Sequence, residues 1–263
     1  MAERTEQQRD PDASAAPPSE RTRVRRLPER GVYDRGTIDA IVDEALICHL
    51  AYVQDGEPRV IPTIHARVGD TLYVHGSNAS RTLRSTKGGA PVAAEVTLLD
   101  GLVLARSAFH HSMNYRSVVV YGRAREVTDP TEKFEAQRAL VEHVVRGRAD
   151  DARLPNDREL NQTTILAISL EEASAKVRTG PPKDEEEDLA LPVWAGILPL
   201  RTVPGEPEPD PLLPSGIARI VVWFSSRSLG RRASSARPRT TCSTSARCAS
   251  NFWVGSVTSR ARP

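Results

Sequence analysis

The sequence contains few cysteines, with only three among 263 residues. Cys48, Cys242 and Cys248 cannot build a disulfide framework, and such sparse use is typical of a reducing compartment. None of them belongs to a Cys-x-x-Cys pair, so we expect no zinc site. We therefore expect a cytoplasmic protein without a bound structural metal.

Long hydrophobic runs are also missing. No stretch approaches the 18 apolar residues that indicate a membrane-spanning helix. The first twenty residues, MAERTEQQRDPDASAAPPSE, lack the apolar core of a secretory signal. We therefore expect no membrane partner.

The chain lacks the common catalytic motifs as well. It has no G-x-G-x-x-G, G-x-x-x-x-G-K-[ST], H-E-x-x-H or G-x-S-x-G pattern. The single histidine pair is His110-His111, and adjacent strand residues point to opposite faces, so the two would not chelate one ion together. A loop or edge position is favoured for this pair over a metal or haem ligand. No catalytic triad or acid/base pair is therefore visible in the sequence.

The small net charge of +2 conceals an uneven distribution. Residues 216–263 hold nine of the 36 basic residues and no Asp or Glu, so residues 1–215 have 27 basic against 34 acidic residues, a net charge of −7. An acidic body does not favour nucleic-acid binding. We predict a disordered tail over 1–20, one folded domain over 21–215, and an Arg/Ser-rich segment over 216–263 that is disordered or the product of a shifted reading frame.

The folded part contains mostly short β-like runs separated by turn residues. Residues 59–68 alternate in polarity as a half-buried strand does, and Gly69-Asp70 follows as a two-residue turn. Asp100-Gly101 predicts a further hairpin turn. One helix is predicted from Thr37 and another after Asp129, with apolar stripes that face inward: Ile38, Ile41, Val42 and Ala45 on the first, and Ala136, Leu140, Val141 and Val144 on the second. Gly122 predicts a bulge in the strand over residues 116–127. Many antiparallel strands with few helices indicate a mainly β fold with flanking α-helices, built as a closed or split barrel.

A cluster of polar residues follows the strand that ends at Gly76. Ser77, Asn78 and Ser80 precede a helical turn in which Arg81 and Arg84 share one face. Backbone N–H groups at a helix start and paired guanidinium groups both suit a phosphate. An ordinary capped surface helix with two exposed arginines is the alternative interpretation.

Other residues could extend this site to hold a phosphorylated planar ligand. Arg59 could reach it from the neighbouring strand, and so could residues at the start of the long strand, namely Asn114, Tyr115, Arg116 and Ser117. Trp194, the sole Trp of the acidic body, would either stack on such a ligand or pack in the core.

Six stretches of this chain resemble the FMN-binding split-barrel superfamily that includes pyridoxamine 5′-phosphate oxidase, and within it the nitroimidazole-reductase-like branch. They are RRLPERGVYD (25–34), CHLAYVQDGEPRVIPT (48–63), LYVHGS and SRTLRS (within 72–85), MNYRSVVVYGRA (113–124), VRTGPPKDEEEDLA (177–190) and VWAGILPL (193–200). They occur in order across residues 21–217.

The resemblance implies a six-stranded Greek-key split β-barrel that works as a homodimer with FMN at the interface. The cofactor-binding residues that it implies are Arg59, Val60, Ile61 and Pro62 on one strand; Val74, His75, Gly76 and Ser77 on the next; Ser80, Arg81 and Arg84 at the phosphate; Ser117 on the long strand; and Trp194 from the partner subunit.

The resemblance further implies an FMN-dependent oxidoreductase that passes hydride through flavin N5 to a small acceptor, such as a nitro-aromatic or quinone-like ring, with NAD(P)H as a candidate donor. The flavin would then carry the chemistry, and no catalytic side chain is expected. The chain has no Arg-x-His element, so pyridoxamine phosphate is not the expected substrate. Two alternatives remain open. One is a deazaflavin-dependent enzyme of the same fold. The other is a non-catalytic flavin- or haem-binding protein, in which haem would depend on His75, His110 or His111.

Overall fold

The computed structural model describes residues 15–217. The predictions for residues 1–14 and 218–263 therefore lie outside the described residues. Residues 15–20, which we expected to belong to a disordered tail, include the start of a turn. In this turn Thr22 N donates to Ser19 O at 3.2 Å, and the Thr22 side chain is buried.

Within the described range, the strands are β1 (Gly31–Val32), β2 (Ile47–Gln54), β3 (Glu57–Val68), β4 (Thr71–Ser77), β5 (Gly88–Leu104), β6 (Ser112–Glu126), β7 (Thr163–Ser169), β8 (Ala173–Arg178) and β9 (Gly196–Pro199). The α-helices are α1 (Arg35–Glu44), α2 (Arg81–Thr86), α3 (Pro130–Val144), α4 (Arg148–Asp151) and α5 (Asp157–Gln162). Short 3-10 helices are η1 (Pro28–Arg30), η2 (Ala108–His110) and η3 (Glu186–Asp188).

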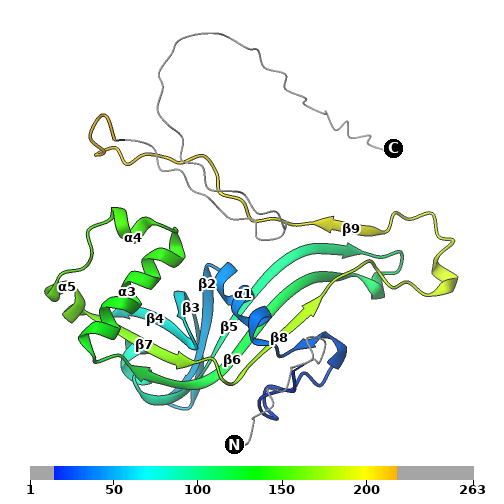
Figure 1. Ribbon diagram of the computed structural model, residues 1–263. Helices are drawn as coiled ribbons and strands as arrows, with labels where there is room; N and C mark the ends of the chain where they lie inside the picture. Colours follow the sequence, from blue (N-terminus) through cyan, green and yellow to red (C-terminus); the bar gives the residue numbers. More distant parts are fainter. Residues whose placement is uncertain (1–14, 218–263) are drawn as a thin grey trace, which may run out of the picture. The chain divides into compact units, whose positions relative to one another are not determined.

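Six of the strands close into a ring. The hydrogen-bonded order is β6-β7-β4-β3-β2-β5, and an additional β5–β6 pairing joins its two ends (Figure 1). All of these pairs are antiparallel. The β6–β7 junction spans only Arg125↔Ala167 and Glu126↔Leu166, which leaves the barrel nearly split there. The predicted six-stranded, mainly β barrel is confirmed.

The predicted hairpin at Asp100-Gly101 is wrong. Residues 88–104 form one continuous strand, β5, which pairs with β6 through a register shift between Leu99 and Gly101. Gly101 lies against β9, because a Cβ there would come within 3.0 Å of Ile197 Cγ2 and 3.1 Å of Leu198 O. The Asp-Gly pair therefore forms a bulge in the strand, where β9 packs closely.

The barrel core is covered at one end by α1. Ile38, Ile41, Val42 and Ala45 were predicted to face inward, and each is at most 3% exposed. The helix begins one turn earlier than predicted, because Asp34 is the N-cap and its carboxylate accepts a hydrogen bond from Thr37 N at 2.8 Å.

Helix α3 begins as predicted. Asp129 is its N-cap, accepting from Glu132 N at 2.8 Å, and Pro130 occupies the first turn. The expected inward stripe is only half correct: Ala136 and Leu140 are buried, whereas Val144 is 44% exposed. Helices α3, α4 and α5 lie together beside β4 and β7 (Figure 1). No helix among the described residues is long and apolar enough to cross a membrane.

Candidate functional site

The site begins on β4, which carries His75 and Gly76 between β3 and β7. His75 is opposite Ile165 of β7, while Val74 is opposite His65 of β3. Val74 is buried in the barrel core, and alternation along the strand turns His75 to the other face.

A cavity of about 240 Å³ lies where α3 crosses β3 and β4. Its lining residues are Ile64, His75, Gln137, Leu140, Val141, Val144 and Arg148. The wall is apolar, apart from one imidazole, one amide and one guanidinium group. Such a lining suits a largely hydrophobic ligand with a few oriented polar groups.

Two polar atoms at this cavity lack partners. His75 Nδ1 and Gln137 Oε1 are both buried, and neither has a hydrogen-bond partner among the described residues. Burial lowers the pKa of His75 below its ordinary value, so its ring is neutral near pH 7. A neutral imidazole is the form that binds a metal ion.

The predicted phosphate segment forms α2, and its position is fixed by two contacts. Tyr52 of β2 is hydrogen-bonded to Thr82 at 2.9 Å. A Cβ on Gly76 would lie 2.9 Å from Leu83 Cδ1, so Leu83 is the close neighbour that accounts for the small residue on β4. Arg81 and Arg84 are exposed on the opposite side of α2.

The small polar residues before α2 have different roles. Asn78 is used within the fold, because its Nδ2 donates to Asn161 O at 2.6 Å and its Oδ1 accepts from Thr164 at 2.7 Å. Ser77 Oγ accepts from Ala79 N at 3.2 Å. Ser80 is the N-cap of α2 by position, but its hydroxyl makes no capping hydrogen bond.

The predicted flavin-lining segment of β3 lies beside β2. Arg59 is opposite Tyr52, and Val60, Ile61 and Pro62 follow in register along the same strand. Arg59 and Pro62 are exposed, and Val60 is 63% exposed, while Ile61 is half-buried. Tyr52, the residue opposite Arg59, is hydrogen-bonded to Thr82, which follows Arg81 in α2.

Ser117 and Trp194 do not join this group within one chain. Ser117 of β6 is opposite Thr97 of β5, and both β5 and β2 stand between β6 and β3 in the strand order. Trp194 precedes β9, which pairs with the far end of β5, and its side chain is 66% exposed. Within the described chain, Trp194 therefore lies apart from the residues of β3, β4 and α2.

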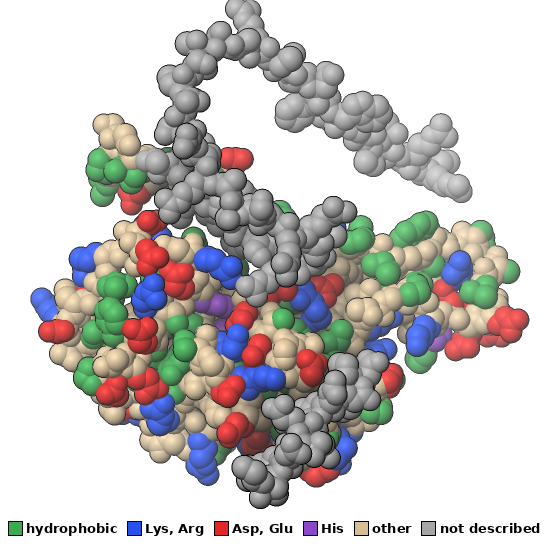
Figure 2. Space-filling view, viewed as in Figure 1, with side chains coloured by type: hydrophobic (Ala, Val, Ile, Leu, Met, Phe, Trp, Pro, Cys, Tyr) green, Lys and Arg blue, Asp and Glu red, His purple; other side chains and the backbone are tan. Residues whose placement is uncertain are grey.

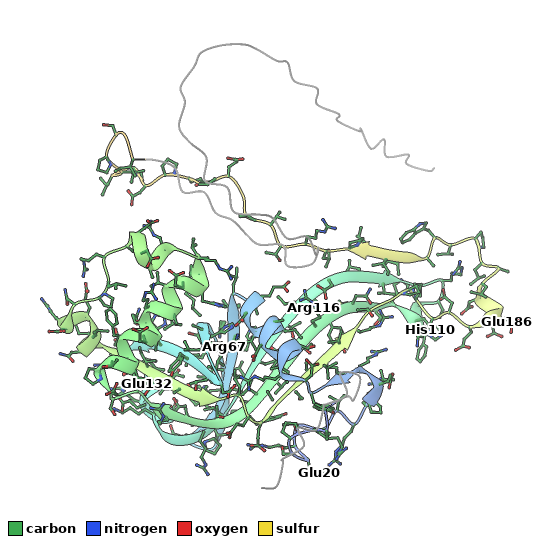
Figure 3. All side chains as sticks on the ribbon, viewed as in Figure 1. Glu20, Arg67, His110, Arg116, Glu132 and Glu186 are labelled. Atoms are coloured by element: carbon green, nitrogen blue, oxygen red, sulfur yellow. The ribbon has the colours of Figure 1, made fainter. Side chains whose placement is uncertain are left out.

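The expectation that Asn114 and Arg116 reach the same site is wrong. Arg116, which is labelled in Figure 3, forms four hydrogen bonds between 2.6 and 2.9 Å with Glu44 of α1 and Asp100 of β5. Asn114 Oδ1 accepts a hydrogen bond from Arg178. Both side chains are held on the β5–β6–β8 side of the sheet.

His110 and His111 lie at the far end of the β5–β6 hairpin, near Glu186 (Figure 3). His110 Nε2 is 3.5 Å from Glu185, and His111 Nδ1 is 3.0 Å from Ser107 O. Across residues 15–217, no group of three or more His, Cys, Asp or Glu residues is placed to hold a metal ion.

Sequence reasoning missed the α3 side of the site. Gln137 and Arg148 were not singled out, and Val141 and Val144 were assigned to the core. The apolar stripe of α3 was visible in the sequence. That part of this stripe lines a cavity rather than the core becomes clear only from the packing of α3 on β3 and β4.

The comparison with known proteins now identifies the fold. Residues 34–177 match the family model described as pyridoxamine 5′-phosphate oxidase. The chain belongs to this family. The match covers more than half of the sequence and includes β2 to β8, and the six-stranded ring described above agrees with the split barrel expected of the family.

Two solved structures are similar to this chain in both sequence and fold. The flavocytochrome Anf3 from Azotobacter vinelandii is 40% identical, over 77% of this chain and 94% of its own, with a TM-score of 0.72. A FAD and heme binding protein from Mycobacterium smegmatis is 36% identical, over 71% of this chain and 92% of its own, with a TM-score of 0.68. No curated protein matches the chain.

Proposed function

We propose that this protein is a flavin-dependent oxidoreductase that also binds haem and works as a homodimer in the cytoplasm. The observation that carries the proposal is its identity of 40% and 36%, over almost the whole length of each relative, to a flavocytochrome and to a FAD and heme binding protein. The arginines near β3 and β4, unpaired among the described residues, support a flavin site, and the apolar cavity beside α3 supports a haem site.

The residues around α2 fit the phosphate of a flavin. Arg59, Arg81 and Arg84 form no ion pair with any residue in 15–217. Arg81 and Arg84 would hold the phosphate, with Ser80 and Ser77 beside them. Val60, Ile61, Pro62 and Gly76 would line the rest of the flavin together with the backbone at Val74 and His75, and a second copy would contribute Ser117 and Trp194.

The bound flavin would supply hydride transfer through N5. The chain would bind and orient it and exclude water from one face. The flavin is FMN by the sequence resemblance, whereas the Mycobacterium smegmatis relative is named for FAD. FMN and FAD both carry a phosphate on the ribityl chain, and Arg81 and Arg84 would bind this phosphate in either flavin. The acceptor that we propose is a small nitro-aromatic or quinone-like ring, with NAD(P)H as donor.

The cavity beside α3 fits one side of a haem. His75 is neutral, and its buried Nδ1 has no partner among the described residues. Leu140, Val141 and Val144 form an apolar wall, and Arg148 is a cation suited to a propionate. Of the three histidines considered from the sequence, His75 is thus the one at a suitable cavity. Haem iron would supply one-electron chemistry there.

Exposed apolar side chains support the homodimer. Among the described residues, those on the strands and the segment before β9 include Val53, Val60, Leu99, Met113, Val193, Trp194 and Leu198. Hydrophobic side chains gather over β9 and the end of the β5–β6 hairpin (Figure 2). A second copy would cover this surface and bring Trp194 to the flavin.

The absorbance spectrum of the full-length protein tests the proposal directly. We expect twin flavin bands and a Soret band in one preparation, and NAD(P)H should bleach the flavin bands. Denaturation followed by chromatography would identify the released flavin as FMN or FAD. A protein that stays colourless after incubation with FMN, FAD and haemin would refute the proposal, and binding of a deazaflavin alone would favour the other enzyme class.

A further inference from the structure

A second cavity, of about 210 Å³, lies where the N-terminal segment meets the end of β8. Its lining residues are Glu29, Arg30, Val177, Arg178, Thr179 and Lys183. Glu29 and Arg30 come from η1, and the others come from the end of β8 and the loop after it. It shares no residue with β3, β4, α2 or α3, so it is separate from the site described above.

The charges at this cavity are unbalanced. Three cations and one carboxylate line it, which gives a net charge of +2. None of Arg30, Arg178 and Lys183 forms an ion pair with a residue in the described part of the chain. The cavity is therefore positive, although the body of the protein is acidic overall.

Arg178 is the buried cation of this group, with only 7% of its surface exposed. Its hydrogen bonds run to neutral oxygens: Asn114 Oδ1, Gly180 O at 3.3 Å and Pro181 O at 3.4 Å. Burial, and then the nearby charge of Arg30, lower the pKa of the guanidinium group. A buried cation without a counter-ion is costly, and an anion in the cavity would offset that cost.

The nearest acidic residues of the loop are occupied elsewhere. The carboxylate of Asp184, the neighbour of Lys183, accepts from Arg106 N at 2.9 Å, Ser107 N at 3.3 Å and Arg106 Nη1 at 3.0 Å. Glu185 is 3.5 Å from His110 Nε2. Neither carboxylate lines the cavity, so the loop itself supplies no counter-ion there.

We propose that Arg30, Arg178 and Lys183 form a binding site for a phosphate-type oxyanion with at least two negative charges, such as a phosphomonoester or a diphosphate. The net charge of +2 matches a dianion, whereas a single carboxylate would leave one cation uncompensated. Asn114 and the two loop carbonyls fix the Arg178 guanidinium, which suits a bidentate contact with phosphate oxygens.

Isothermal titration of the full-length protein as purified, with inorganic diphosphate as the probe, tests this site. Arg30→Met and Lys183→Met remove partly or fully exposed side chains and spare the fold better than a change at buried Arg178. We expect each to weaken diphosphate binding about tenfold, the usual effect of losing one charge-assisted contact. Arg26→Met, on the same N-terminal segment but outside the cavity, should leave the dissociation constant unchanged.

Two further arms identify the ligand and exclude the other cationic region. Tighter binding of ADP than of inorganic diphosphate would identify a nucleotide as the source of the phosphate, and the reverse order would identify the free anion. Acetate at matched ionic strength should not bind. The proposal is overturned if diphosphate gives no saturable heat at millimolar concentration, or if Arg81→Met abolishes binding while Arg30→Met and Lys183→Met do not.

Discussion

The imidazole rings of His65 and His143 lie against each other with centroids 4.6 Å apart, and both are anchored to the end of α1. His65 Nε2 donates to Val42 O at 2.9 Å, and His143 Nε2 donates to Ala45 O at 2.7 Å. His65 is fully buried, and its Nδ1 has no hydrogen-bond partner within residues 15–217. The pair therefore connects β3, α3 and α1, and burial favours the neutral form of both rings.

Acid should destabilise the protein through this pair. Burial lowers the pKa of His65 from 6.5 to about 4, and it also lowers that of His143; the nearby Asp43 opposes both shifts. Between pH 6.5 and 4 the unfolded chain binds more protons than the folded chain, so the free energy of unfolding falls as the pH falls. His65 alone contributes about 3 kcal/mol of this loss.

Urea denaturation at several pH values measures that loss. His65→Gln keeps a donor for Val42 O and cannot be protonated, so its unfolding free energy should depend less on pH over this range. His111→Gln, at the end of the β5–β6 hairpin, is the control and should follow the parent protein. An unchanged pH dependence in His65→Gln would show that other groups dominate acid unfolding.

Arg116→Met should destabilise the protein by about 1–3 kcal/mol, because it leaves Glu44 and Asp100 without their shared partner. Arg116 joins α1 to β5 through bidentate bonds and is only 28% exposed. The exposed pair Arg138–Asp150 offers a matched control, and Arg138→Met should cost clearly less stability, because solvent screens an exposed pair. Equal losses in both variants would mean that the Arg116 network is no stronger than a surface pair.

The phosphate-binding role that we propose for α2 predicts a selective effect on flavin affinity. Arg81→Met and Arg84→Met should each raise the flavin dissociation constant about tenfold, as expected for one lost charge-assisted contact. Fluorescence titration of the apoprotein measures it. Arg158→Met, an exposed arginine on α5, should have no effect. Wild-type affinity in both α2 variants would place the flavin phosphate elsewhere.

His75→Ala should remove the Soret band and leave the flavin bands in place, because we propose that His75 binds the haem iron and only borders the flavin. Added imidazole should restore part of the haem signal by filling the space of the lost ring. His110→Ala and His111→Ala are the comparison variants, and both should keep the Soret band. Loss of haem in either of them, with retention in His75→Ala, would contradict the assignment.

The elements of the barrel were predictable because the residues that begin and end them act over only a few positions of the sequence. Gly69-Asp70 and Asp129-Pro130 fix a turn and a helix start within a few residues, and the structure shows both as predicted. Asp100-Gly101 carries an equally clear turn signal, yet it is a bulge. Contacts with Ile197 and Arg116, which are distant in sequence, override the local preference there.

The candidate site was less predictable because its parts meet only through packing. The position of α2 depends on the contact between Tyr52 and Thr82, and the cavity at His75 depends on where α3 crosses the sheet. His65 and His75 sit on neighbouring strands with similar sequence context, yet one is a buried structural group and the other lines a cavity. Strand alternation alone does not distinguish these two roles.

Gly122 was expected from the sequence to mark a bulge, but it is opposite Val92 in an unbroken stretch of the β5–β6 ladder. The reason for glycine here is space: a Cβ would lie 2.9 Å from Ile168 Cγ2 of β7. A β-branched side chain has little freedom to move that methyl group away. Gly122→Ala should therefore destabilise the protein by about 1–3 kcal/mol, the usual cost of overpacking.

A double-mutant cycle separates this clash from a general effect of the substitution. Ile168→Leu conserves side-chain volume and should cost the parent protein under about 1.5 kcal/mol. It also removes the γ2 methyl group that a Cβ at position 122 would meet. In the Gly122→Ala background the same change should cost less than in the parent protein or even increase stability, giving a favourable coupling above about 0.5 kcal/mol. Thermal or urea unfolding of the four proteins measures the coupling. Strictly additive effects would show that Ile168 is not what restricts position 122.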